Sequence, residues 1–375
     1  MMRIVLFANT DWYLYNFRLA LADALKAAGH EVVLLSPQGE WGERLRAAGH
    51  DWRVFPFARH GLNPLAELAV LWRLWRLYRA LQPDVVHHFT IKCVLYGTVA
   101  ARCAGVRKVV NAITGLGHVM MSSSWKARLL RPIILTVYRV LFAGCDIVFQ
   151  NRDNLALFQK LGVLRRARAH LVPGSGVNLA RFDMAPPPAD QPPVVLMVAR
   201  LLWAKGIATF VEAAASVRRQ RAEIEFWLVG DRDDSNPDCI PQAQVERWAS
   251  EGAVRFLGHR EDIPQLNARA SLAALPSHGE GLPRTLIEAA ASARPLLASD
   301  VPGCRDIVRH GENGLLFPRG DAAAFAASVL RLVDDPVTAR RMGLAARADA
   351  ERYYDDAHNI AQTLAVYAAP ASAPA

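Results

Sequence analysis

The feature that most constrains the fold is an alternation of short apolar runs with helical patterns along almost the whole chain. The runs are rich in Val, Ile, Leu and Phe, and the first five are residues 4–7, 32–35, 85–86, 109–110 and 147–149. A continuous apolar run buries a strand on both faces, and helices between such strands indicate a parallel sheet with both faces covered. The sequence therefore predicts an α/β fold. With 52 % apolar and 21 % charged residues, the composition excludes a largely disordered chain.

A second series of runs and a proline-rich segment divide the chain in two. The later runs are residues 194–198, 226–229, 254–257, 272–275, 296–298 and 315–317. Between the two series, the five prolines of residues 185–193 favour a stiff linker, because they continue neither a helix nor a central strand. We therefore expect two doubly wound domains, 1–184 and 194–353, then a helix over 354–367 that packs back on the first domain, and a disordered tail over 368–375.

The net positive charge is concentrated in the front half. Residues 1–184 hold 24 Lys and Arg against 11 Asp and Glu, whereas the remainder holds 20 against 24. A basic excess of this kind indicates contact with phosphates.

Cysteine spacing and hydropathy predict a cytoplasmic protein that does not span a membrane. Five cysteines without a CxxC pair indicate neither a zinc site nor a disulfide framework. The apolar run at residues 4–8 is too short for a secretory signal. A spanning helix needs about 18 uncharged apolar residues, and the best candidate, residues 129–149, is interrupted by Arg131, Pro132, Arg139 and Asp146.

The most informative motif runs from Pro276 to Glu288. It predicts a strand end, a glycine-containing loop and then a helix with Pro283 in its first turn. Free amides at such a helix start suit a diphosphate. Glu280 precedes the helix and Glu288 lies about 1.5 turns inside it, so both can face one cleft and accept hydrogen bonds from vicinal sugar hydroxyls. For a single glutamate, a helix cap or a solvated side chain is the simpler interpretation.

Two cations form a second candidate group. Arg200 follows the run at residues 194–198, and Lys205 opens the next helix five residues later. Placed at the carboxyl end of a strand, they could neutralise a departing diphosphate. By itself the pattern is weak, because Arg and Lys in loops are usually solvated.

Together these windows resemble the retaining glycosyltransferases of family 4. That family carries an E-x₇-E motif, matched by Glu280 and Glu288, and an Arg-x₄-Lys pair, matched by Arg200 and Lys205. Further similar segments are residues 174–178, 301–306 and 311–314. The resemblance covers residues 3–355 and implies the GT-B fold, in which the parallel sheets of two Rossmann-like domains face a central cleft.

The resemblance also implies a role for each matched residue. Arg200 and Lys205 would bind the diphosphate of a nucleotide-sugar donor, which we expect to be a UDP-sugar, and Glu288 would bind its ribose. Glu280 would bind the transferred sugar on the face where the anomeric bond breaks. The predicted catalytic residues are therefore Glu280, Arg200 and Lys205, together with His118.

We expect no metal ion and no cofactor besides the donor. Asp231, Asp233 and Asp234 superficially suggest a metal cluster, but nothing in the sequence supplies further ligands, and the two cations already provide positive charge. By resemblance, the amides of Gly281 and Leu282 would contact the β-phosphate.

The front half is similar to bacterial transferases that extend lipid-linked oligosaccharides. The matching segments are residues 87–92, 96–97 and 113–118, and among those transferases are N-acetylgalactosaminyltransferases acting on undecaprenyl-diphosphate-linked bacillosamine and enzymes of O-antigen and capsule synthesis. We therefore predict that the acceptor, a polyprenyl-diphosphate-linked saccharide, is bound by four residues of this half: Arg18, His87, His88 and Lys92.

The chain departs from the family pattern at three places. The loop after the first strand, residues 9–18, lacks the usual glycines, so Arg18 is assigned to the acceptor rather than the donor. Thr114 and Gly115 stand where many members have a catalytic-site histidine, and we expect His118 to take that part. Ala293 replaces a usual glycine, a change that we expect to be tolerated.

The segment from Leu65 to Leu81 predicts a basic amphipathic helix. One face carries apolar and aromatic residues at helical spacing, namely Leu68, Leu71, Trp72, Trp75, Tyr78 and Leu81, and another carries Arg73, Arg76 and Arg79. Such a helix fits a membrane interface, and the alternative is an ordinary helix packed on the sheet. A lipid-linked acceptor favours the first interpretation, so we expect peripheral contact with the cytoplasmic face of the inner membrane.

The predicted function is retaining transfer of an N-acetylhexosamine or hexose from a UDP-sugar to a polyprenyl-diphosphate-linked saccharide, as in lipopolysaccharide, O-antigen or glycoprotein-glycan assembly. A sugar-nucleotide epimerase on the same fold is an alternative, and it would turn over the donor without an acceptor. A nucleic-acid-binding protein is less favoured, because the basic residues do not alternate with exposed aromatic residues and no reader motif is present.

Overall fold

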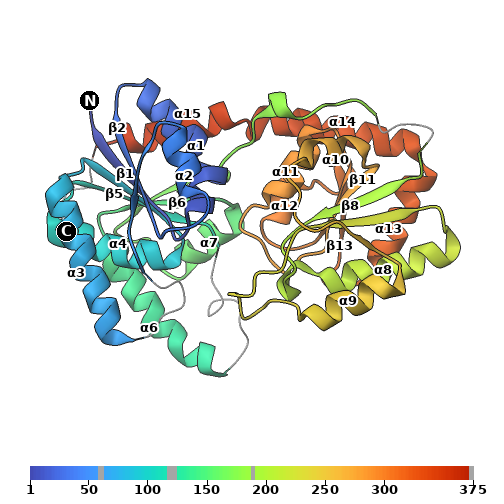
Figure 1. Cartoon of the computed structure of the whole chain (residues 1–375), viewed down its shortest axis with the longest axis horizontal. Coiled ribbons are helices and arrows are strands. Elements are labelled where there is room, and N and C mark those ends of the chain that lie inside the picture. Colours follow the sequence, from blue (N-terminus) through green and yellow to red (C-terminus); the bar gives the residue numbers. More distant parts are fainter. Residues whose placement is uncertain (58–62, 116–124, 187–190, 371–375) are drawn as a thin grey trace. The chain divides into compact units, whose positions relative to one another are not determined.

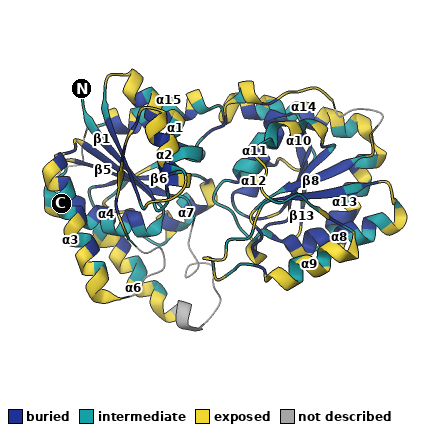
Figure 2. Ribbon diagram, viewed as in Figure 1, coloured by how far each residue is buried: buried dark blue, intermediate teal, exposed yellow. Residues whose placement is uncertain are grey.

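The chain forms two compact units in the computed structural model, which describes residues 1–57, 63–115, 125–186 and 191–370 (Figure 1). The N-terminal unit comprises Met1–Ser175 together with Ala357–Ala375, and the C-terminal unit comprises Gly176–Asp356. In each unit helices pack around a parallel sheet, and the strands at its centre are buried (Figure 2).

The N-terminal unit contains a seven-stranded sheet in the order β3-β2-β1-β4-β5-β6-β7. Its strands are β1 Arg3–Phe7, β2 Glu31–Ser36, β3 Asp51–Val54, β4 Val85–Phe89, β5 Lys108–Ile113, β6 Asp146–Phe149 and β7 Arg168–Leu171. Its helices are α1 Asp11–Ala27, α2 Gly42–Ala47, α3 Pro64–Leu81, α4 Ile91–Ala104, α6 Trp125–Phe142, α7 Arg152–Lys160 and most of α15 Asp356–Ala368.

The C-terminal unit contains a six-stranded sheet in the order β10-β9-β8-β11-β12-β13. Its strands are β8 Val194–Val198, β9 Glu225–Val229, β10 Arg255–Phe256, β11 Leu272–Leu275, β12 Leu296–Ser299 and β13 Gly314–Phe317. Its helices are α8 Ile207–Gln220, α9 Gln242–Glu251, α10 Ile263–Arg269, α11 Arg284–Ala291, α12 Cys304–Ile307, α13 Ala322–Asp334 and α14 Pro336–Tyr353, with 3₁₀ turns η1 Leu179–Arg181 and η2 Trp203–Lys205.

Every apolar run identified in the sequence forms or overlaps a strand, which confirms the predicted parallel α/β architecture. No apolar run marks the other two strands, β3 and β7, although the helix end at Gly49 and His50 predicts a strand at the position of β3. Both lie at the edges of the N-terminal sheet and most of their residues are exposed or half-buried. An edge strand has fewer neighbours to bury it, so it carries no continuous apolar run for sequence analysis to detect.

The first boundary between the units falls just after Ser175. We expected it later, in the proline-rich segment at residues 185–193. The intervening residues pack on the C-terminal unit, because Val177 and Phe182 are buried in its core. Arg347 also donates a hydrogen bond to the Phe182 carbonyl oxygen. The chain re-enters the N-terminal unit with α15, whose Tyr367 is buried in that core. Residues 187–190 of the proline-rich segment and 371–375 of the tail lie outside the described residues.

Helix α3 is present, but its predicted single apolar face is wrong. The buried side chains are those of Val70, Leu74, Tyr78 and Leu81. Leu68 and Trp72, which were predicted on the same face as Tyr78, are exposed. The helix packs on the core with residues spaced by four, four and three, which leaves some of its apolar residues facing outward. Among the described residues, no helix combines the length and hydropathy that crossing a bilayer requires.

Candidate active site

The strand order of the C-terminal unit locates a binding position. The order along the sheet reverses between β8 and β11, which are neighbours although β9 and β10 lie between them in the chain. In open parallel sheets, ligands bind outside the carboxyl ends of the strands at this reversal. The loop after β8 contains Arg200 and Lys205, and the loop after β11 contains Glu280. The predicted donor residues therefore follow the two strands that flank the reversal.

Close backbone contacts hold these two loops together. Gly206 lies at φ +73°, and a Cβ atom placed on it would be 1.9 Å from the Pro276 carbonyl oxygen, so only glycine fits. The Ala204 carbonyl oxygen accepts hydrogen bonds from the Ser277 hydroxyl at 3.0 Å and from the His278 amide at 2.8 Å. The loop after β12 contributes Gly303, whose Cα faces the carbonyl oxygens of residues 280 and 281. Three loops therefore build a single rigid edge.

Lys205 and Glu280 form an ion pair at this edge. The Lys205 Nζ atom lies 2.7 Å from Oε1 and 2.8 Å from Oε2 of Glu280. The carboxylate side chain is only 9 % exposed, whereas the lysine side chain is 24 % exposed. The pair is thus sheltered on the protein side and partly open on the other, and its two charges neutralise each other in the described structure.

Arg200 does not join this pair but bonds to Asp233. Its Nη1 atom lies 2.7 Å from Asp233 Oδ2, and the arginine side chain is half-exposed. Asp233 also accepts a hydrogen bond from the Ser235 hydroxyl, and Asp234 pairs with Arg232. The aspartates of this loop therefore act as partners for arginines. In the part of the chain that the structure describes, no three His, Cys, Asp or Glu side chains group as metal ligands would.

Helix α11 carries the second glutamate of the motif. Glu288 lies one turn after Arg284 and accepts a hydrogen bond from its Nε atom at 2.9 Å. Burial raises the pKa of Glu288, and the nearby guanidinium groups of Arg284 and Arg181 only partly oppose this shift. Leu282 packs against the core just before the helix, and within the described residues its amide donates no hydrogen bond. The predicted phosphate-binding amide is thus available to a ligand.

In the N-terminal unit the strand order reverses between β1 and β4, and two predicted acceptor residues meet there. Arg18 of α1 lies over the Phe89 ring at 4.3 Å, and the His87 ring packs on the same Phe89 at 4.1 Å. The guanidinium is buried and donates to the Tyr13 hydroxyl, and among the described residues no carboxylate pairs with it. His87 Nδ1 bonds to the Tyr367 hydroxyl at 2.6 Å.

Two polar atoms of this cluster have no hydrogen-bond partner in the described structure, namely Arg18 Nε and His87 Nε2. Burial, followed by the charge of Arg18, lowers the pKa of His87 well below its ordinary value, so its ring is neutral near pH 7. A buried cation without a carboxylate is costly unless an anion reaches it. This cluster is therefore a candidate anion site.

The other two predicted acceptor residues are engaged within the unit. His88 points to the opposite face of the sheet, where its Nδ1 atom bonds to Asn111 Oδ1 and its Nε2 atom to the Tyr78 hydroxyl. Neither ring nitrogen of His88 is left for an acceptor. Lys92 of α4 pairs with Glu67 of α3 at 2.8 Å. His118 lies outside the described residues.

Sequence analysis missed several groups that complete these clusters. Tyr367, which holds His87, is 280 residues away in the chain, and no local pattern connects the two. Asp233 was considered only as a metal ligand, although an acidic residue after the strand beside Arg200 could have indicated an ion pair. Gly303 lies within residues 301–306, a segment already identified as similar to the family, but no role was assigned to it.

Family models match both units. A model described as glycosyl transferases group 1 matches residues 192–335, and one described as glycosyl transferase 4-like matches residues 3–152. The first covers the loops with Arg200, Lys205 and Glu280, and the second covers Arg18 and His87.

Curated relatives share most of the chain. The N,N'-diacetylbacillosaminyl-diphospho-undecaprenol alpha-1,3-N-acetylgalactosaminyltransferase of Campylobacter jejuni is 30 % identical over 96 % of this chain and 96 % of its own length. The UDP-Gal:alpha-D-GlcNAc-diphosphoundecaprenol alpha-1,3-galactosyltransferase of Escherichia coli is 28 % identical over 68 % of this chain and 67 % of its own.

Solved structures share the fold. The Anabaena protein HepE, in complex with UDP and glucose, superposes with a TM-score of 0.77 at 20 % identity and covers 98 % of this chain and 100 % of that one. The sucrose-phosphate synthase of Thermosynechococcus elongatus gives 0.77 at 21 % identity, with 98 % of both chains covered. With two Rossmann-like units, matching family models and a relative that is 30 % identical over nearly the whole length, this chain belongs to the group 1, family-4-like glycosyltransferases of the GT-B fold.

Proposed function

We propose that this glycosyltransferase transfers a sugar from a UDP-sugar to a polyprenyl-diphosphate-linked saccharide with retention of the anomeric configuration. The observation that carries the proposal is the Lys205–Glu280 pair at the carboxyl edge of the C-terminal sheet. The relatives from C. jejuni and E. coli are named for undecaprenyl-diphosphate-linked acceptors, and the E. coli relative for a UDP-sugar. These names support the proposed substrate classes.

Donor binding would separate Lys205 from Glu280 and give each of them a new partner. The diphosphate offers Lys205 a stronger anionic partner than one carboxylate, and the amide of Leu282 is available to a phosphate oxygen. Glu280 would then be free to accept hydrogen bonds from hydroxyls of the transferred sugar. Arg200 would leave Asp233 for the diphosphate in the same way. Glu288 would accept the ribose hydroxyls. Two cations would neutralise the leaving group, so we propose that no metal ion takes part.

The proposed reaction proceeds on one face of the sugar. The acceptor hydroxyl oxygen forms a bond to the anomeric carbon as the bond from that carbon to the diphosphate oxygen breaks. The acceptor proton passes to the departing diphosphate, which Arg200 and Lys205 hold in place. The motif supplies one carboxylate, Glu280, for the reacting centre and assigns Glu288 to the ribose, and this favours attack from the front face.

The acceptor would be bound by the N-terminal unit. Arg18 supplies a buried positive charge for the acceptor diphosphate, and His87 supplies a neutral imidazole beside it. Lys92 would need to leave Glu67 to contribute. The exposed Leu65, Leu68 and Trp72 of α3, with three exposed arginines on the same helix, support peripheral contact with the cytoplasmic face of the inner membrane.

The test is transfer from a panel of UDP-sugars to an undecaprenyl-diphosphate-linked saccharide. We expect one donor to react, an α-linked product by NMR when the donor is α, and an unchanged rate in a metal chelator. An inverted linkage would overturn the retaining mechanism, and a rate abolished by the chelator would overturn the metal-free one. Incubating each donor alone tests the epimerase alternative, since an epimerase converts the donor without an acceptor.

A further inference from the structure

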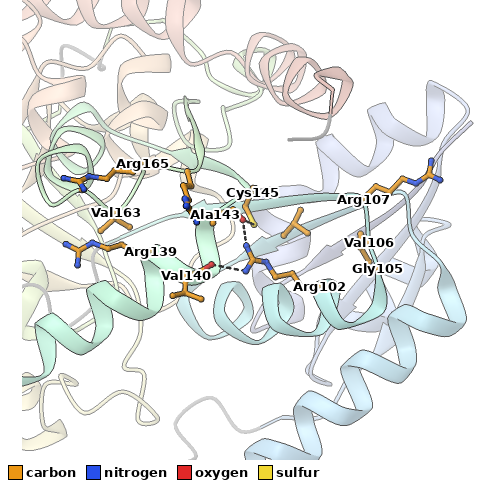
Figure 3. Close-up of a pocket in the computed structure, with 14 residues that line it drawn as sticks. Arg102, Gly105, Val106, Arg107, Arg139, Val140, Ala143, Cys145, Val163 and Arg165 are labelled. Atoms are coloured by element: carbon orange, nitrogen blue, oxygen red, sulfur yellow. Dashed lines mark hydrogen bonds between the residues drawn. The ribbon is translucent and has the colours of Figure 1, made fainter. Parts of the chain in front are cut away.

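A hollow of about 930 Å³ lies in the N-terminal unit at the amino-end edge of its sheet (Figure 3). It is lined by residues at the amino ends of β5 and β6 and by the last turns of α4 and α6. The candidate acceptor cluster is formed by other elements, with His87 in β4 and Arg18 in α1. The hollow is therefore a separate feature, and no predicted site residue lines it.

Five arginines line this hollow, together with small and apolar residues such as Val106, Val109 and Val163. The arginines are Arg102, Arg107, Arg139, Arg165 and Arg166. Within the described ranges, none of the five pairs with a carboxylate. The neighbouring Asp146 does not offset them, because it is buried and already paired with Lys108 and Arg168.

Two of the arginines are fixed and three remain available. Arg102 donates to the carbonyl oxygens of Val140 and Ala143 at the end of α6, and Arg139 donates to the Leu161 carbonyl oxygen at 2.7 Å. In Figure 3 the side chains of Arg139 and Arg165 extend in the same direction on one side of the hollow. Arg107, Arg165 and Arg166 are exposed, and their side chains make no hydrogen bond or ion pair in the described structure.

An exposed apolar stripe on α6 leads to the hollow. Leu129, Ile133, Val137 and Val140 recur at spacings of four, four and three, which places them on one helical face. Leu129, Ile133 and Val140 are 65 %, 61 % and 62 % exposed. Val140 also lines the hollow, so the stripe and the arginines form one continuous surface.

We propose that this surface binds an anionic phospholipid bilayer, with a headgroup phosphate in the arginine hollow and the α6 stripe in the interfacial apolar layer. Guanidinium groups bind phosphate through paired hydrogen bonds. Charge complementarity supports this occupant, since residues 101–150 hold seven Lys and Arg and a single acidic residue. A soluble phosphate would account for the arginines but would leave the adjoining stripe in water. The site is distinct from the α3 surface of the proposed function and does not depend on the donor residues.

Flotation with lipid vesicles tests the arginines. Arg165→Ala/Arg166→Ala should weaken binding to vesicles of phosphatidylglycerol and phosphatidylcholine by about thirty-fold at low salt. The matched control is Arg340→Ala/Arg341→Ala, which removes two exposed, unpaired arginines of α14 in the C-terminal unit and should leave binding unchanged. Since these vesicles contain neither sugar donor nor glycan acceptor, the result is independent of transfer activity.

A second pair of variants tests the stripe. Leu129→Ser/Ile133→Ser should weaken vesicle binding, whereas Val337→Ser/Leu344→Ser, at exposed positions of α14, should not. The proposal is overturned if the Arg165/Arg166 variant binds vesicles like the parent protein. It is equally overturned if the Arg165/Arg166 and Arg340/Arg341 variants lose the same amount of vesicle binding. It is also overturned if only Leu68→Ser/Trp72→Ser on α3 abolishes binding, or if inorganic phosphate binds the hollow while vesicles do not bind at all.

Discussion

The two units share one architecture but treat charge differently. Each is a parallel sheet whose strand order reverses once, and each places polar side chains at the reversal. The N-terminal unit holds 23 Lys and Arg against 10 Asp and Glu, whereas the C-terminal unit holds 21 against 25. The same topology therefore supports a strongly basic unit and a slightly acidic one, because the charges lie on loops and helix surfaces that the sheet does not constrain.

In the C-terminal unit the cations at the site already have carboxylate partners. Lys205 pairs with Glu280, Arg200 with Asp233 and Arg284 with Glu288. In the N-terminal unit, Arg18 and Arg165 have no carboxylate partner among the described residues. A ligand of the C-terminal unit must therefore replace a carboxylate as the partner of each cation. The N-terminal unit instead presents positive charge that only an external anion can neutralise.

The largest effect is expected from breaking the pair at the C-terminal site. Glu280→Ala should lower the rate of sugar transfer by about a thousand-fold, because it removes a group placed at the reacting centre. The free energy of urea unfolding should fall by only about 1 to 2 kcal/mol, because the pair is mostly sheltered but Lys205 keeps 24 % of its side chain in solvent. The control is Glu251→Ala, an exposed glutamate of α9 paired with Arg247. A large loss of stability with retained activity would make the pair structural.

The second-largest effect is expected at Gly206, where the loops after β8 and β11 touch. Gly206→Ala should lower the free energy of unfolding by about 3 kcal/mol, because the new Cβ would overlap the Pro276 carbonyl oxygen and the backbone is left-handed. Gly105→Ala in the N-terminal unit is the matched control. It has a similar φ of +76° but no atom within 4 Å of the new Cβ, so it should cost about 1 kcal/mol. Equal losses in urea denaturation would contradict the packing argument.

Acid should destabilise the N-terminal unit selectively. Burial lowers the pKa of His88 from 6.5 to about 4. Between these values the unfolded chain binds a proton that the folded unit rejects, so stability present above pH 6.5 is lost as the pH falls, by about 3 kcal/mol in all. His87 shifts in the same direction. In the described C-terminal unit no histidine is buried, although partial desolvation lowers the pKa of the exposed His278 in the same direction.

The measurement is urea unfolding at neutral pH and at about pH 5, with proteolysis identifying which unit opens first. His88→Gln cannot titrate in this range, so its stability should fall less steeply with acid than that of the parent. If the C-terminal unit opened first in acid, or if the variant kept the full slope, the assignment to His88 would fail.

The smallest effect contrasts two strained positions. Ala293 of the C-terminal unit lies at φ +56°, and Thr90 of the N-terminal unit lies at φ +73° and ψ 151°. Replacing either by glycine should stabilise the protein by about 1 kcal/mol, measured as a higher melting temperature. Ala293→Gly should leave transfer unchanged, whereas Thr90→Gly should reduce it, because Thr90 directly follows His87, His88 and Phe89 at the strand reversal. If Ala293→Gly and Thr90→Gly both lost transfer activity, the predicted difference between the two positions would be contradicted.

Much of the fold was predictable because buried strands leave a local signal. The run at residues 194–198 coincides with β8, and the helix expected to have Pro283 in its first turn begins one residue later, at Arg284, with Pro283 at its N-cap. The edge strands β3 and β7 carry no apolar run, because most of their residues are exposed or half-buried, and β7 was missed. Helix α3 was recognised, but which of its apolar residues are buried depends on the sheet beneath it.

The candidate site divides in the same way. Glu280, Glu288, Arg200 and Lys205 were found from their spacing, since each follows a strand or opens a helix. Their pairing was not predicted, because an ion pair such as Arg200–Asp233 joins loops that sequence spacing does not relate. His87 and His88 are adjacent in the chain, yet they lie on opposite faces of the sheet and only one retains an unpartnered ring nitrogen.

By itself, the sequence determined the α/β class, the two series of strands, the motif residues and the basic front half. These follow from local periodicity and composition, which neighbouring residues in the chain express directly. Three contacts became visible once the chain was folded: Tyr367 holds His87, Glu280 neutralises Lys205, and five scattered arginines line one hollow beside an exposed face of α6. The physical reason is that hydrogen bonds and charges act over a few ångströms of space, and the fold sets those distances independently of separation along the chain.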